Sequence, residues 1–211
     1  MKWSIGIDPG LGETGVVLCR DDVQPLTEEW VTYSCPPGDE DVARVVSLAG
    51  AVIDCIVGWI EEYGIEQLDI CIELPVYKHN AATYTKQIRL LEEIESGLFF
   101  LVAGEVKQLY LTEVYPSTSK GLLTNDGRAD KDRMVECYEK LHPPWDKGVN
   151  RATKEAVADA YAHSLACWLT GANLRMTRVN LTDLQAAVVK EKGRYRGQDH
   201  SARTGCADGE G

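Results

Sequence analysis

The chain has 211 residues, 44% hydrophobic and 26% charged, which fits one globular domain large enough to bury a core. No uninterrupted run approaches the roughly 18 apolar residues of a membrane span, and the first residues enter a strand pattern instead of a signal peptide. We therefore expect a cytoplasmic protein that contacts no membrane. Seven scattered cysteines without a C-x-x-C pair argue against a disulfide framework or a structural zinc site.

The net charge of −11 counts against a nucleic-acid partner, so its distribution along the chain matters. Residues 1–70 contain 3 basic and 14 acidic residues, whereas residues 71–211 contain 19 of each sign. All of the excess acid belongs to the first third, where a solvated acidic face is the simplest interpretation. The rest of the chain can still present a local basic surface, and we expect DNA to meet that side.

Turn residues and alternation predict three antiparallel strands at the start of the chain. Residues 4–7 and 14–19 flank a glycine-rich turn, which is typical of a β-hairpin, and residues 29–34 supply the third strand. After a Pro-Pro-Gly break, apolar residues recur at helical spacing over 42–63, and Gly64 follows as a C-cap.

The rest of the chain alternates strands with helices. The periodicity predicts two strands and three helices, at residues 68–74, 109–115, 81–103, 130–141 and 154–169. Together with the first strands, this order predicts an α/β fold with a mixed five-stranded sheet flanked by helices. We predict one domain, a helical extension and a polar disordered tail, over residues 1–175, 176–191 and 192–211.

Three acidic residues occupy positions where a carboxylate is costly. Asp8 ends an apolar strand, Glu73 ends a second one, and Asp159 sits on a helix of small and apolar residues. A buried carboxylate needs a partner or a metal ion, and several that meet at one point repel each other unless cations lie between them. Such oxygen ligands suit Mg²⁺ or Mn²⁺, and two ions can hold the attacking water and the leaving oxygen of a phosphodiester.

Each of these acids also has a purely structural interpretation. Asp8 could shape the turn that follows it, Glu73 could pair with Lys78, and Asp159 could be a partly exposed helix residue. The three positions taken together favour the metal site.

Four segments resemble the motifs of the RuvC-type Holliday-junction resolvases, in the same order along the chain. Ile5–Gly15 resembles that family's opening strand, D-P-G-x-x-x-T-G, which begins with a catalytic aspartate, and Ile70–Glu73 resembles a strand ending in a catalytic glutamate. Tyr115–Lys120 and Thr124–Lys131 resemble a P-S-x-x-K and a G-R-A-D-K segment, with the eleven-residue spacing of their lysines preserved. Val157–Ala160 resembles the family's helix motif D-A-x-A.

The resemblance implies an RNase H-like fold and a homodimer that cuts two symmetric strands of a four-way DNA junction. By position, Asp8, Glu73 and Asp159 match ligands of two Mg²⁺ ions per active site, for which Mn²⁺ would substitute. Lys120 and Lys131 match lysines that neutralise the scissile phosphate, a role that suits a compact point charge, although solvated loop lysines are the structural alternative. The helix over 81–103 is the implied dimer interface, and a phage is one source of such a protein.

The sequence departs from the family at one metal ligand. The family places an Asp or His three residues before its last aspartate, where this chain has Ala156. Glu155 and His163 both lie about one helical turn from Asp159, so either could replace the missing ligand. We favour Glu155, because its length would let it reach the second ion.

Further basic and aromatic residues predict a DNA path around this site. The family has an aromatic that stacks on bases near the branch point, a role that Tyr77 could take. Lys78, Lys86 and Arg89 could line the adjoining DNA, and Arg128 could contact the backbone.

Three other functions compete with junction resolution. A broader nuclease for flaps and other branched DNA would use the same chemistry, and a non-catalytic junction-binding homologue would explain Ala156. An actin-like ATPase would use the glycine turn after Asp8 as a phosphate loop, but that fold needs two such domains and a longer chain.

Overall fold

The computed structural model describes residues 2–21, 26–35, 41–77, 80–142 and 144–170. Its strands are β1 (Lys2–Asp8), β2 (Thr14–Asp21), β3 (Leu26–Tyr33), β4 (Gln67–Glu73) and β5 (Gln108–Val114). Its helices are α1 (Asp41–Tyr63), α2 (Ala81–Gly97), the π-helix η1 (Leu98–Val102), α3 (Pro116–Thr124), α4 (Lys131–Leu141) and α5 (Arg151–Thr170). The predicted extension, the predicted tail and Lys78 lie outside the described residues.

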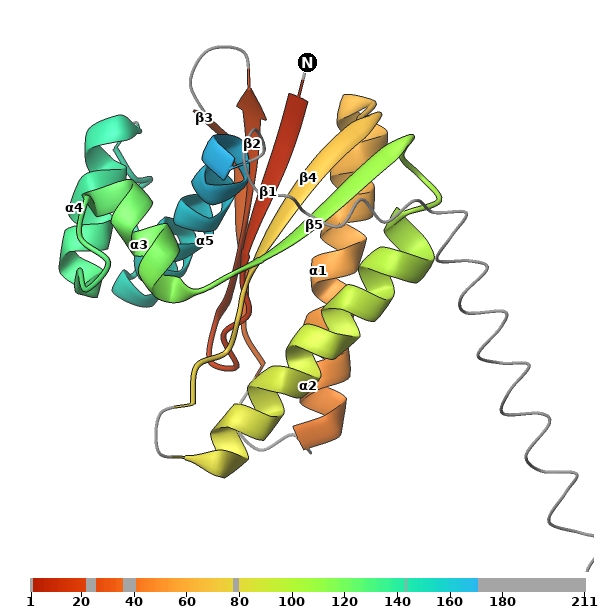
Figure 1. The fold of residues 1–211 in the computed structure, drawn as a ribbon, viewed down its shortest axis with the longest axis horizontal. Coiled ribbons are helices and arrows are strands. Elements are labelled where there is room, and N and C mark those ends of the chain that lie inside the picture. Colours follow the sequence, from red (N-terminus) through yellow and green to blue (C-terminus); the bar gives the residue numbers. More distant parts are fainter. Residues whose placement is uncertain (1, 22–25, 36–40, 78–79, 143, 171–211) are drawn as a thin grey trace, which may run out of the picture. The chain divides into compact units, whose positions relative to one another are not determined.

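The five strands form one mixed sheet in the order β3-β2-β1-β4-β5. The first three strands pair antiparallel, and β1, β4 and β5 pair parallel. Helices cover both faces, with α1 and α2 on one side and α3, α4 and α5 on the other (Figure 1). The predicted α/β fold with a mixed five-stranded sheet is therefore confirmed, as is the opening hairpin.

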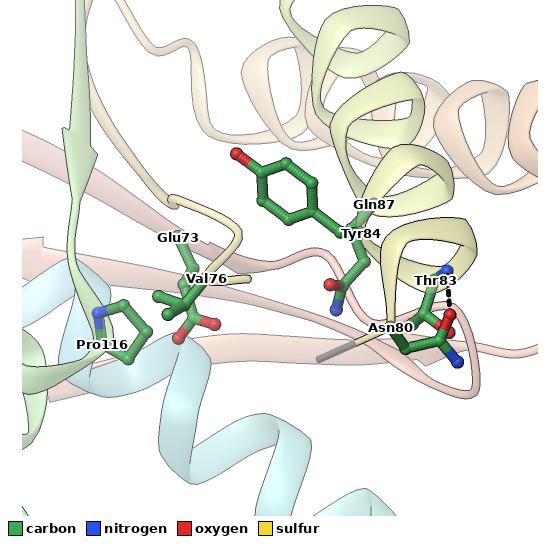
Figure 2. Close-up of a pocket in the computed structure, with 7 residues that line it drawn as sticks. All are labelled: Glu73, Val76, Asn80, Thr83, Tyr84, Gln87 and Pro116. Carbon is green, nitrogen blue, oxygen red and sulfur yellow. Dashed lines mark hydrogen bonds between the residues drawn. The ribbon is translucent and has the colours of Figure 1, made fainter. Parts of the chain in front are cut away.

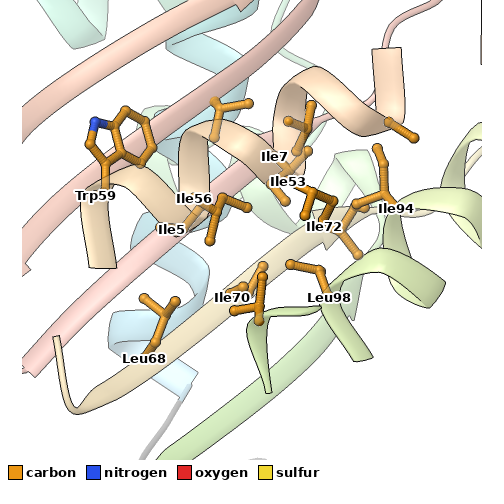
Figure 3. Close-up of a cluster of buried hydrophobic side chains, with 14 of the residues drawn as sticks. Ile5, Ile7, Ile53, Ile56, Trp59, Leu68, Ile70, Ile72, Ile94 and Leu98 are labelled. Atoms are coloured by element: carbon orange, nitrogen blue, oxygen red, sulfur yellow. The ribbon is translucent and has the colours of Figure 1, made fainter. Parts of the chain in front are cut away.

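One face of the sheet carries the large apolar core. Because side chains alternate along a strand, Ile5 and Ile7 of β1 point to the same face as Ile70 and Ile72 of β4. All four are fully buried in one cluster with side chains from α1, α2 and η1, part of which is shown in Figure 3. Burying such a side chain contributes roughly 1.5–3 kcal/mol, so this face supplies much of the stability.

On β1 and β4 the opposite face is lined by small and polar residues, whereas Val17 and Cys19 of β2 pack there with apolar side chains of α4 and α5. On β1 the small and polar residues are Ser4, Gly6 and Asp8, and on β4 the alternate positions end at Glu73. Helix α5 packs directly on β1, β2 and β4, while α3 and α4 pack against α5. This layer therefore brings helical side chains to the strand ends that carry the two acids.

Two segments differ from their sequence-based predictions. Residues 116–124, for which no helix was predicted, form α3, which begins with Pro116 at its first turn and ends before Asn125 in the left-handed conformation, with φ 61°. The helix expected over 81–103 is α-helical only to Gly97 and continues as η1. The first difference matters for the site, because α3 carries Lys120.

Among the described residues, one helix is long and apolar enough by composition to cross a membrane, over Val42–Tyr63 of α1. A buried core helix meets the same criteria. In α1 the residues at helical spacing, such as Val52, Ile56 and Ile60, are buried in the cluster beneath the sheet.

Candidate active site

Asp8 and Glu73 are brought together by strand pairing. β1 and β4 run parallel with Ile7 opposite Ile72, so the next residue of each strand, Asp8 and Glu73, lies at the same edge of the sheet. Both belong to the face that α5 covers, because each follows an isoleucine of the apolar face. The pairing therefore places the two predicted acids next to each other.

Two glycines let α5 approach the strands closely enough to add its own side chains. A Cβ on Gly6 would lie 1.8 Å from the carbonyl oxygen of Ala160, and a Cβ on Gly15 would lie 2.4 Å from that of Ala156. Such distances cannot exist with any larger residue, so the helix backbone rests on the strand backbone. One turn of α5, with Asp159 on it, consequently lies beside the acids.

The structure gathers a three-residue group that could hold a metal ion. One ligand atom each of Asp8, Glu73 and His163 lie within 4.8 Å of one another. The Nε2 atom of His163 lies 3.2 Å from Glu73 Oε2, yet it is buried without a hydrogen bond. Its Nδ1 atom is 2.7 Å from Ser119 Oγ of α3. Two carboxylates and an imidazole nitrogen form a donor set that fits a divalent cation.

Electrostatics show that these groups crowd one another. Burial raises the pKa of Asp8 well above its usual value, and the charges of Glu73 and Asp159 raise it further, against lowering effects of His163 and Lys131. Burial also raises the pKa of Asp159. Burial lowers the pKa of His163, but the neighbouring carboxylates outweigh it and the pKa is raised. Asp159 is thus close enough to interact with Asp8, although it is outside the three-residue group. A cation would relieve this repulsion.

The two predicted lysines also reach this region. Lys131, at the start of α4, affects the pKa of both Asp8 and Asp159, and Lys120 lowers the pKa of Asp159. Lys120 Nζ donates to the carbonyl oxygen of Ala129 at 3.1 Å, which ties α3 to the segment before α4. Two cations therefore flank the carboxylates.

Glu155 and Ala156 lie on the same helix but do not join the metal-capable group. Glu155 Oε2 is 3.1 Å from Lys131 Nζ, and its Oε1 accepts from Arg151 Nε at 2.7 Å. These contacts lower the pKa of Glu155, mainly through Arg151. Ala156 is buried against Gly15, the residue paired with Asp8. Our preference for Glu155 over His163 as the extra ligand stays a prediction, although His163 is the one that contacts Glu73.

A cleft opens beside Glu73, between the end of β4 and the start of α2. Its volume is about 170 Å³, and it is lined by Glu73, Val76, Asn80, Thr83, Tyr84, Gln87 and Pro116 (Figure 2). The exposed Tyr77 ring meets Tyr84 edge to face, with centroids 5.7 Å apart. Glu73 therefore connects the acidic group to a cleft whose lining is partly aromatic and partly polar.

The remaining predicted DNA contacts come from two parts of the chain. Lys86 and Arg89 belong to α2, and Arg128 is exposed in the segment between α3 and α4. Sequence analysis did not single out Ser119, Tyr84 or Gln87. Ser119 has no local signal, because its partner His163 lies 44 residues further along the chain.

The fold was compared with known proteins. Neither a family model nor a curated protein sequence matches this chain. The structure of RuvC from Thermus thermophilus matches with a TM-score of 0.58 at 17% identity, covering 81% of this chain and 95% of that one. The same protein in complex with a Holliday-junction substrate matches with a TM-score of 0.57 at 16% identity, covering 82% and 96%.

A mitochondrial resolvase gives a third match. The yeast mitochondrial Holliday-junction resolvase has a TM-score of 0.55 at 12% identity, with 86% of this chain and 83% of that one covered. The chain has the RuvC fold. The predicted RNase H-like architecture is thereby confirmed.

Proposed function

We propose that the protein is a divalent-metal-dependent DNA endonuclease that resolves four-way junctions by paired symmetric nicks. The observation that carries the proposal is the meeting of Asp8, Glu73 and His163 ligand atoms within 4.8 Å, on a RuvC fold. A solved RuvC structure with this fold holds a Holliday-junction substrate, which supports branched DNA as the substrate here.

Asp8, Glu73 and Asp159 are the proposed ligands for two Mg²⁺ ions, with Mn²⁺ able to replace them. As the fourth ligand we propose His163 in place of Glu155, because its Nε2 lies 3.2 Å from Glu73 Oε2, whereas Glu155 is paired with Lys131 and Arg151. Bound ions of this kind activate water and stabilise the departing 3′ oxygen. The pKa values of Asp8 and Asp159 are raised in the metal-free protein, and bound cations would stabilise the charged form of both carboxylates.

The chain's own cations would hold the phosphate. Lys131 is 56% exposed and pairs with Glu155 at 3.1 Å, so its flexible side chain can turn toward a phosphate. Lys120 is anchored by its hydrogen bond to the carbonyl oxygen of Ala129, close enough to Asp159 to lower its pKa. Each supplies a compact positive charge near the acids.

The DNA path would run from this centre along the start of α2. Tyr77 is exposed and braced by Tyr84, which suits stacking on a base at the branch point. Lys86, Arg89 and Arg128 would contact the phosphate backbone.

Paired nicks require two active sites, so we propose a homodimer formed through the α2–η1 helix. Phe100 and Leu101 of η1 support this surface, because they are 62% and 59% exposed although large and apolar. Sedimentation of wild type against Phe100→Glu should show loss of the dimer. A wild-type monomer at micromolar concentration would contradict paired cleavage.

The function can be tested with labelled synthetic DNA. Wild-type protein is incubated with a four-way junction, a matched duplex and a flap, in Mg²⁺, Mn²⁺ or EDTA. Symmetric nicks confined to the junction, and absent in EDTA, support the proposal. Equal cutting of flaps would indicate a broader branched-DNA nuclease, and binding without cutting in either metal would indicate a non-catalytic homologue.

Asp8→Asn provides the matched control. It should abolish cleavage while leaving junction binding, because the amide keeps the shape of the carboxylate without its charge. In metal-free buffer it should also melt at a higher temperature than wild type, since one of three crowded acids is gone. Retained cutting would place the metal site elsewhere.

A further inference from the structure

The hydrogen bond between Ser119 and His163 links two parts of the proposed centre. Ser119 lies on α3 immediately before Lys120, and His163 lies on α5 one turn after Asp159. Each of the two residues is 1% exposed, and Ser119 Oγ is 2.7 Å from His163 Nδ1. In the P-S-x-x-K resemblance Ser119 occupies a variable position, so its role does not come from that motif.

The two ring nitrogens of His163 have different surroundings. Nδ1 meets the serine hydroxyl, whereas Nε2 is buried 3.2 Å from Glu73 Oε2 with no hydrogen bond. A neutral imidazole carries one proton, and the hydrogen bond at one nitrogen decides which nitrogen keeps its lone pair. Metal-binding histidines usually donate their other N–H to a fixed acceptor, which sets the tautomer and the ring orientation.

We propose that Ser119 is a positioning residue that accepts the Nδ1–H of His163, so that Nε2 presents its lone pair to a metal ion shared with Asp8 and Glu73. This inference rests on the proposed metal centre. A serine suits the role because its hydroxyl oxygen can accept the Nδ1–H while its own proton rotates away. The bond also couples the helix that carries Lys120 to the helix that carries Asp159.

Metal affinity provides the first test, with Mn²⁺ alone as the probe and free Mn²⁺ measured by electron paramagnetic resonance on the full chain. Ser119→Ala should raise the Kd for Mn²⁺ by about 10–100-fold, the usual loss for a residue that orients a metal ligand. Ser164→Ala is the matched control, because it also removes a buried 2.7 Å serine contact, to Ser4, from the residue next to His163. It should leave the Kd unchanged.

A double-mutant comparison separates positioning from general packing. If Ser119 acts through His163, Ser119→Ala should add no further loss of Mn²⁺ affinity in a His163→Ala background. Equal losses in both backgrounds, or equal losses for Ser119→Ala and Ser164→Ala, would overturn the proposal.

The tautomer itself can be read in wild-type protein, which keeps the test valid if a variant fails to fold. ¹⁵N chemical shifts of the His163 ring in Mg²⁺-loaded protein should show the proton on Nδ1. A proton on Nε2, or wild-type protein that binds no Mn²⁺, would overturn the inference. Tight Mn²⁺ binding with the expected tautomer but no junction cleavage would instead reject only the proposed function.

Discussion

The two faces of the sheet carry different side chains and have different effects on stability. The face under α1 and α2 is filled with large apolar side chains such as Ile5, Ile70 and Ile72. The face under α5 uses Gly6 and small helix residues to let backbones touch, and it buries acids and histidines. The first arrangement gains stability from the larger buried apolar area, whereas the second holds repelling charges in place beside a smaller apolar cluster. The comparison indicates that the stability gained at the apolar face offsets the destabilising effect of the crowded acids in the metal-free protein.

The largest effect on stability should come from the apolar face. Ile70→Ala removes a fully buried side chain of β4 and should lower the free energy of unfolding by about 2–5 kcal/mol, through lost burial and the cavity left behind. Urea unfolding measures this loss. Cleavage by the folded fraction should stay within a few-fold of wild type, and a much larger loss of activity would show that the faces are not separate.

Gly6→Ala tests the close approach on the other face. Its Cβ would lie 1.8 Å from Ala160 O, so α5 must shift, at a cost of about 3 kcal/mol. Unlike Ile70→Ala, it should also abolish cleavage at temperatures where the protein is folded, because Asp159 moves with the helix. Gly50→Ala is the control, since no atom lies within 4 Å of its added Cβ. Full activity in Gly6→Ala would contradict the proposed role of this contact.

The pH dependence should also come from the α5 side. His142 stacks on Tyr138 at 4.2 Å between ring centroids, and burial lowers its pKa to about 4, below the ordinary 6.5. The folded protein disfavours the protonated form of His142. The contribution of His142 to the free energy of unfolding is therefore present above pH 6.5 and is lost as the pH falls toward 4. Between pH 7 and pH 5 this amounts to about 2 kcal/mol.

His142→Phe keeps the stacking and removes the titration. The free energy of unfolding of this variant should therefore fall less than that of wild type between pH 7 and pH 5. Parallel urea titrations of the two proteins measure the difference. Identical slopes for the two proteins would show that His142 is not held neutral in the folded state.

The positions of the strands along the chain were predictable, whereas one helix was not. Alternation and turn residues located all five strands, because burial on one or both faces leaves a clear pattern. Helix α3 has no apolar stripe, and its sequence is dominated by serine, threonine and glycine. Pro116 followed by Asn125 in a left-handed cap was the available signal, which alone also fits a loop.

The acids of the site were predictable because they interrupt apolar segments. Asp8, Glu73 and Asp159 each occupy a position where burial is costly, and the structure brings them close. The choice between Glu155 and His163 as the extra metal ligand was not predictable, since both lie a turn from Asp159. Only the packing of α3 and α4 separates them, by placing Ser119 beside one and Lys131 beside the other.

The smallest expected effect would settle that choice. Glu155→Gln keeps an oxygen for Lys131 and Arg151 but removes the charge, and the mostly exposed partners limit the stability loss to less than about 1 kcal/mol. If Glu155 only holds Lys131 in place, Mn²⁺ affinity should be unchanged and junction cleavage should fall a few-fold. If Glu155 is itself a ligand, Mn²⁺ affinity should fall as steeply as in His163→Ala. The same Mn²⁺ titration on both variants therefore identifies the residue that replaces the ligand missing at Ala156.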